Sequence, residues 1–163
     1  MVRSGGLAIR FRWERDCRRF VEFIEFIGFV ELEAKQHVST AERFEDLRIW
    51  QTARAVSAAV YRASRDGGFR RDFSLRDQIR RAANSISSNI AEGFSRRSNK
   101  EFAQFLFVAK GSAAEVQSQL YLAVDQEYIS QEEFDELYET VDDLARQISR
   151  LITYLREADN PHE

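Results

Sequence analysis

The sequence LRDQIRRAANSISSNIAEG, which spans residues 75–93, predicts a long helix with one apolar face. Its apolar residues recur at three- and four-residue spacing: Leu75, Ile79, Ala82, Ile86 and Ile90. This spacing places them along one side of a helix. We expect Gly93 to end the helix in a left-handed conformation, because glycine adopts positive φ without a steric penalty.

The rest of this helix surface is rich in small polar residues, namely Asn84, Ser85, Ser87, Ser88 and Asn89. Such residues are poor helix formers, because their side chains compete for backbone hydrogen bonds. They indicate either close packing against neighbouring helices or a polar seam. In the seam, Asn89 and Glu92 would make hydrogen bonds within the bundle or across subunits. We favour close packing, since small residues on a helix usually mark a close approach.

Composition favours one helical domain. The chain has 163 residues, with only 7 glycines and 1 proline, which favours long helices over a turn-rich β architecture. Cys17 is the only cysteine, so no intramolecular disulfide is expected. No uncharged run is long enough to cross a membrane, and glutamates interrupt the apolar run 20–32, unlike a signal peptide. We therefore expect a cytoplasmic protein without a membrane anchor.

Three further amphipathic segments flank the central helix. We expect a first helix over about 45–65, the central one from Ser74 to about Glu92, a third that opens at Ser98 and a fourth that opens at Ser130. The three serines are predicted N-caps, because an acidic residue follows each at the third position, as in a capping box. The apolar residues of the fourth helix alternate three and four apart, which suits antiparallel packing in a left-handed bundle.

The domain boundaries follow from these segments. We predict a helical bundle over residues 43–157 and a frayed tail over 158–163. Residues 1–40 form an N-terminal extension whose structure the sequence leaves open. It is either an artefact of a start site placed too early, with the native start near Val38, or an additional helix on the bundle.

The third helix is apolar on more than one face. Phe107 and Val108 lie outside its main apolar stripe, and a second apolar face in a small bundle predicts a subunit interface. Gly111 removes side-chain bulk where another helix could approach. The alternative is that Gly111 is a tolerated weak point, costing about 1 kcal/mol relative to alanine.

Charge is distributed unevenly along the chain. Residues 62–100 contain ten basic and four acidic residues, a net charge of +6, whereas residues 101–163 contain four basic and fourteen acidic residues, a net charge of −10. The candidate nucleic-acid-binding residues are Arg76, Arg80, Arg81, Arg96, Arg97 and Lys100. Arginine and lysine clustered in this way bind phosphate backbones. Alternatively, these cations pair with the acidic fourth helix or with a neighbouring subunit.

No catalytic, metal or cofactor site is predicted. Di-metal sites in helix bundles use Glu-x-x-His motifs. That motif is absent here, and the only histidines, His37 and His162, lie outside the predicted bundle. A single cysteine gives no structural metal site, and no glycine-rich phosphate loop occurs. We therefore do not expect an enzyme.

Four segments together resemble the 23S rRNA intervening-sequence protein family: FEDLRIWQTA (44–53), QIRRAANSISSNIAEG (78–93), RRSNKEFAQFLFVAKGSAAEV (96–116) and LYLAVDQEYIS (120–130). The resemblance covers about residues 43–156. It implies an all-α, antiparallel up-down four-helix bundle that assembles as a homo-oligomer, often a pentamer. A related branch, the accessory protein of diversity-generating retroelements, is thought to bind nucleic acid and a reverse transcriptase.

Together these features predict a non-enzymatic oligomer that binds structured RNA or DNA. Asn89, Glu92, Phe107, Val108 and Gly111 are its predicted subunit contacts. The alternative function is a protein-interaction scaffold with no nucleic-acid role.

Overall fold

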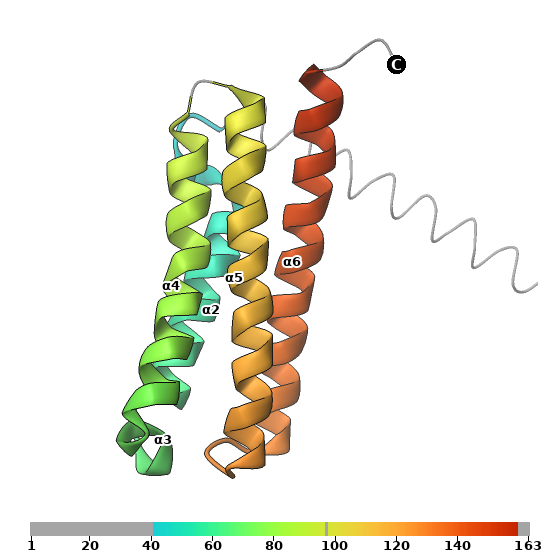
Figure 1. Cartoon of the computed structure of the whole chain (residues 1–163). Coiled ribbons are helices and arrows are strands. Elements are labelled where there is room, and N and C mark those ends of the chain that lie inside the picture. Colours follow the sequence, from blue (N-terminus) through green and yellow to red (C-terminus); the bar gives the residue numbers. More distant parts are fainter. Residues whose placement is uncertain (1–40, 97, 160–163) are drawn as a thin grey trace, which may run out of the picture. The chain divides into compact units, whose positions relative to one another are not determined.

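The computed structural model describes residues 41–96 and 98–159, and all of its regular elements are helical. A short 3-10 helix η1 (Phe44–Asp46) precedes α2 (Arg48–Ala63), α3 (Gly67–Arg71), α4 (Phe73–Phe94), α5 (Asn99–Asp125) and α6 (Gln131–Asp159). Four of these are long and run up and down beside one another, while α3 is a single short turn at one end (Figure 1). The predicted all-α four-helix bundle is confirmed.

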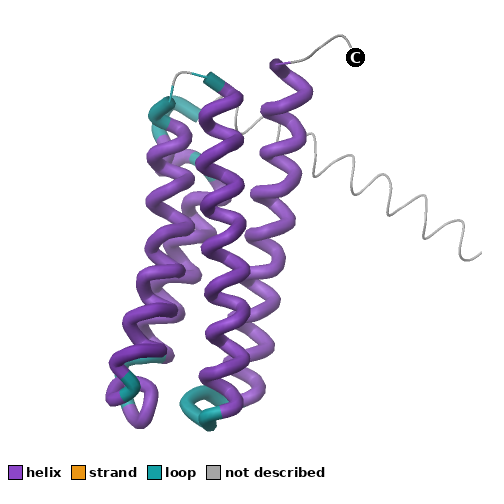
Figure 2. The backbone as a smooth tube through the Cα atoms, viewed as in Figure 1, coloured by secondary structure: helices purple, strands orange, loops and turns teal. Residues whose placement is uncertain are grey.

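The four long helices form a square in cross-section. α4 packs against α2 and α5, and α6 packs against α5 and α2, so that α4 and α6 stand across the diagonal. Short loops join successive helices at alternate ends (Figure 2). The diagonal placement keeps the arginines of α4 away from the carboxylates of α6.

The apolar stripes predicted from the sequence form the core. All five apolar residues of the central stripe are buried, with Ile86 and Ile90 fully inaccessible. The stripes of α5 and α6 are buried in the same way, for example at Leu106, Leu144 and Ile148. Burial of these faces, rather than intrinsic helix propensity, explains why α4 tolerates so many serines and asparagines.

Two of the three predicted N-caps are confirmed. The Ser98 hydroxyl accepts a hydrogen bond from the Glu101 amide at 3.3 Å, and the Ser130 hydroxyl accepts one from the Glu133 amide at 3.2 Å. The prediction of Ser74 as the cap of α4 is wrong. The N-cap of α4 is Asp72, whose carboxylate accepts a hydrogen bond from the Leu75 amide at 3.0 Å.

The connection between α2 and α4 contains a further short helix. Residues 67–71, between the first two predicted helices, form α3. Gly67, with φ of 64°, supplies the left-handed turn that starts α3, and Phe69, only 1% exposed, anchors it to the core. The Tyr128 ring, from the α5–α6 loop, stacks on Phe69 with ring centroids 5.4 Å apart.

Gly93 does not end α4 as expected. α4 continues to Phe94, and Gly93 is buried against α5. A Cβ at this position would lie 2.7 Å from the Phe102 ring and 2.7 Å from the Phe105 Cβ. Gly93 therefore permits a close helix approach, which agrees with the favoured close-packing interpretation of this segment.

Candidate nucleic-acid and interaction surfaces

The predicted basic residues divide into two groups at opposite ends of α4. Arg76, Arg80 and Arg81 lie in its first half, whereas Arg96 follows its C-terminus and Lys100 lies in the first turn of α5. Arg80 and Arg96 are sixteen positions apart, which corresponds to about 24 Å of helix. Arg97 lies outside the described residues.

Arg80 is committed to contacts inside the protein. Its guanidinium donates to the Ser64 hydroxyl and to the Ser64 carbonyl, both at 2.8 Å, and lies 4.7 Å from the centre of the Tyr61 ring. Ser64 is fully buried at the end of α2. Arg80 thus satisfies the carbonyl at a helix C-terminus, where a cation is favoured. Its role is to join α2 to α4.

Arg76 and Arg96 are also engaged. Arg76 donates to the Asp77 carboxylate at 2.8 Å and to the Arg70 carbonyl at 3.0 Å, and it covers the Phe73 ring. The hydrogen bond from Arg76, with the nearby charges of Arg76, Arg81 and Arg80, holds the pKa of Asp77 below its usual value.

At the other end of α4, Arg96 forms an ion pair with Glu92 and lies over the Phe105 ring. Exposed pairs of this kind contribute little to stability, and Arg96 can exchange Glu92 for another anion.

Several other cations are open. Arg81 and Lys100 are exposed, and within the described part of the chain neither makes a hydrogen bond, an ion pair or a ring contact. The guanidinium groups of Arg70 and Arg71 on α3 are open in the same way, as is that of Arg62 in the last turn of α2. We call Arg62, Arg70, Arg71 and Arg81 the arginine corner.

The sequence did not single out Arg62, Arg70 and Arg71 as candidate site residues. The sequence feature that could have identified them is their position beside Gly67-Gly68. A tight turn at these glycines brings Arg70 and Arg71 close to the end of α2.

The predicted alternative, in which these arginines pair with the acidic last helix, has no support within the described residues. Every ion pair found there joins residues at most four positions apart, and α6 pairs its own Asp142 and Asp143 with Arg146. The diagonal position of α4 and α6 explains the absence of pairs between them.

The predicted subunit contacts lie in two places. Phe107 and Val108 are 51% and 54% exposed on the outer side of α5, and Gly111 has no neighbouring atom where a Cβ would stand. Tyr121 and Leu122, each 51% exposed, extend this surface along α5. We call these five residues the α5 outer face.

Asn89 and Glu92 are on α4 and already have partners within the chain. Asn89 donates to the Ser85 carbonyl at 2.7 Å, and the Ser85 and Ser112 hydroxyls share a hydrogen bond at 2.8 Å between α4 and α5. A small polar seam therefore exists inside the protomer, alongside the close packing at Gly93. The contacts predicted for Asn89 and Glu92 across subunits remain a prediction.

Residues 41–96 and 98–159 contain no group of histidine, cysteine, aspartate and glutamate side chains that could hold a metal ion. In the same part of the chain, no helix combines the length and apolarity that a bilayer crossing requires. His37 and His162 lie outside the described residues.

Comparison with known families identifies the bundle. The family model for the 23S rRNA-intervening sequence protein matches residues 45–150, which comprise η1 to most of α6. The chain belongs to this family. The match spans both the α4–α5 packing and the arginine corner, so these features lie within the family's own region of the chain.

Solved structures share the fold of this chain. One of them is a protein of unknown function from the S23 ribosomal protein family of Bacteroides thetaiotaomicron, with 21% sequence identity and a TM-score of 0.59. The similarity covers 64% of this chain and 97% of that one. At this identity it shows the fold alone. A comparison with curated proteins gives no match.

Proposed function

We propose that the protein is a non-enzymatic, oligomeric bundle that binds the backbone of structured RNA or DNA through its arginine corner. The observation that supports this is the set of exposed guanidinium groups on α2, α3 and α4 that lack a carboxylate partner within the described residues. Unpaired guanidinium groups release counterions when they meet phosphates, which is the main source of affinity for nucleic-acid backbones.

The open cations and those with partners in the chain have different roles in the proposed nucleic-acid binding. Arg81 and Lys100, with Arg70 and Arg71, contact phosphates directly. Arg80 positions the end of α2 beside α4 and keeps its own charge near the surface. The proposed roles of Arg76, Arg96 and Arg97 are additional phosphate contacts. Arg76 and Arg96 would then exchange Asp77 and Glu92 for phosphate.

The proposed binding reads the shape and charge of the nucleic acid rather than its sequence. Phosphate contacts fix position without distinguishing bases. In a homo-oligomer, for which we propose a pentamer on the basis of the family, each copy adds one arginine corner. Several corners on one assembly would bind a folded nucleic acid more tightly than a single protomer. We place this activity in the cytoplasm, in agreement with Cys17 being the only cysteine.

The proposal is tested by fluorescence anisotropy of the full chain with a labelled RNA hairpin and a labelled DNA duplex across a series of salt concentrations. We expect binding that weakens steeply with salt, with a slope of log K against log salt of about −0.9 for each phosphate contact on duplex DNA. Absence of binding at low salt by a folded oligomer would overturn the proposal.

A second candidate function is supported by the α5 outer face. An exposed apolar surface of this kind on a soluble bundle typically contacts another protein. We propose that the part of this face formed by Phe107, Val108 and Gly111 contacts a second copy of the chain. Phe107→Ser should then reduce the number of copies in sedimentation, with little dependence on salt. The same number of copies in Phe107→Ser and the wild type would remove this candidate.

A further inference from the structure

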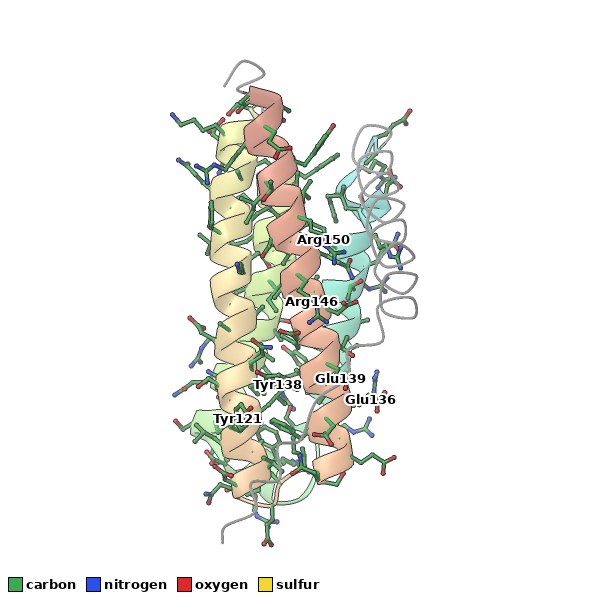
Figure 3. The ribbon with its side chains drawn as sticks, turned by 90° about the vertical axis from the view of Figure 1, so that its right-hand side faces the viewer. Tyr121, Glu136, Tyr138, Glu139, Arg146 and Arg150 are labelled. Atoms are coloured by element: carbon green, nitrogen blue, oxygen red, sulfur yellow. The ribbon has the colours of Figure 1, made fainter. Side chains whose placement is uncertain are left out.

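A cluster of three aromatic rings lies where α5 and α6 pack near their shared loop. Tyr121, Phe134 and Tyr138 have ring centroids between 4.9 and 5.6 Å apart. Phe134 is buried, Tyr138 is half-buried and Tyr121 is 51% exposed. Figure 3 shows Tyr121 and Tyr138 side by side on their two helices. A hydrogen bond with Tyr121, together with the effect of its charge, partial burial and Asp142, raises the pKa of Tyr138.

The part of the chain that carries these rings is acidic. The segment from Gly111 to Ala145 contains ten acidic and no basic residues. Among them, Asp125 stands four positions after Tyr121, and Asp135 stands three positions before Tyr138, which places each on the face of its tyrosine. Both are exposed, and neither has a cationic partner within the described residues. We call Tyr121, Tyr138, Asp125 and Asp135 the tyrosine patch.

Four other aromatic rings of the chain have a different environment. Guanidinium groups lie over the rings of Trp50, Tyr61, Phe73 and Phe105, at 6.0, 4.7, 4.7 and 4.8 Å from their centres. Each of these cation–π contacts is supplied by an arginine of the chain itself. At the tyrosine patch the aromatic rings and the carboxylates are present, but no guanidinium group of residues 41–96 or 98–159 lies over either tyrosine ring.

We infer that the tyrosine patch docks an arginine-rich segment of a partner protein. A guanidinium can stack on the exposed Tyr121 ring while it donates two hydrogen bonds to a neighbouring carboxylate, which an ammonium group cannot do. Leu122, also half exposed, adds apolar surface for the stems of such side chains. The many carboxylates exclude nucleic acid from this side, because they repel its phosphates.

This surface is separate from the arginine corner in charge and in composition. Arg146, the first cation after the acidic segment, is paired with Asp142 and Asp143 and so does not fill the patch. Figure 3 places Arg146 and Arg150 farther along α6 than Tyr138. The two surfaces lie at the same end of the bundle, because Phe69 of α3 stacks on Tyr128 of the α5–α6 loop (Figure 1).

The test uses the full chain and two fluorescein-labelled peptides. One carries arginines at helical spacing in an alanine and glutamine background, and in its twin every arginine is lysine. Because both peptides carry the same charge, a difference between them reports stacking and bidentate hydrogen bonding rather than net attraction. We expect the arginine peptide to bind about three- to fivefold more tightly than the lysine peptide.

Variants connect this preference to the patch. Tyr121→Ala should abolish it, and Tyr121→Phe, which retains the ring, should keep it. Phe73→Ala is the control, since Phe73 is an exposed ring that Arg76 of the same chain already covers, and it should keep the preference. Equal affinities for the two peptides, or a preference that survives Tyr121→Ala, would overturn the inference.

Sedimentation of the same samples excludes a second copy as the occupant. If the wild type does not bind the arginine peptide, and Tyr121→Ala reduces the number of copies in the assembly, the patch is covered by another copy and the inference is wrong. Binding of the peptide without a change in the number of copies supports it. RNA affinity should be unchanged in Tyr121→Ala, which separates this test from that of the proposed function.

Discussion

The arginine-rich half and the acidic half of the bundle each combine side chains that have partners within the chain with side chains that are open. In the arginine-rich half, Arg76, Arg80 and Arg96 already bind carbonyls, carboxylates or aromatic rings of the same chain. In the acidic half, the carboxylates of Asp125 and Asp135 have no cationic partner within the described residues. Residues of one chemical type therefore divide into those that stabilise the fold and those that are available to bind other molecules. Contacts, rather than composition, separate the two classes.

The largest effect is expected where an engaged arginine is compared with an open one. Arg80→Met removes two hydrogen bonds and leaves the buried Ser64 carbonyl unsatisfied, which should lower the free energy of unfolding by about 2–3 kcal/mol. Arg81→Met, one position away on the exposed surface, should change it by less than about 0.5 kcal/mol. Urea denaturation of both variants measures the difference. Equal losses would show that the division between engaged and open arginines is false.

The two glycines in the long helices give the next contrast. Gly93→Ala introduces a Cβ 2.7 Å from the Phe105 Cβ, and this crowding should outweigh the gain in helix propensity. We expect a loss of about 1–2 kcal/mol in the free energy of unfolding, measured by the same denaturation. An increase in stability would mean that α4 and α5 pack less closely than described.

The smallest effect has the opposite sign. Gly111→Ala adds a Cβ where no atom lies within 4 Å, and alanine is the better helix former. The free energy of unfolding of the protomer should rise by up to about 1 kcal/mol. Sedimentation of the same variant tests the predicted subunit contact. Fewer copies would show that another chain approaches Gly111 closely, whereas an unchanged assembly would place the contact elsewhere on α5.

Much of the fold could be predicted from the sequence, because each long helix carries its own apolar period. The stripe from Leu75 to Ile90 and the caps at Ser98 and Ser130 depend only on residues a few positions apart. Such local patterns are visible without knowledge of the fold. Asp72 was missed as a cap, since Ser74 with Asp77 fits the same pattern two residues later.

The features that the sequence could not give depend on long-range contacts. Arg80 and Ser64 are sixteen residues apart, and no local pattern links them. A glycine at the end of an apolar stripe, such as Gly93, has the same sequence pattern whether it ends the helix or allows another helix to pack closely. Only the position of Phe102 and Phe105 in the folded chain distinguishes these two roles. The nucleic-acid role of the candidate residues stays a prediction: Arg81 and Lys100 are open, whereas Arg80 makes contacts inside the protein.

The most direct test of the account compares RNA affinity in two matched double variants of the full chain. Arg71→Gln/Arg81→Gln removes two open arginines from the arginine corner, and Arg150→Gln/Arg156→Gln removes two open arginines from α6, so both variants have the same net charge. In the first variant we expect the RNA affinity to fall about ten- to hundredfold. The slope of log K against log salt should become shallower by the equivalent of about two phosphate contacts. Both quantities should change little in the second variant. Equal losses in both variants would show that overall charge, rather than the arginine corner, binds the nucleic acid, and would contradict the account.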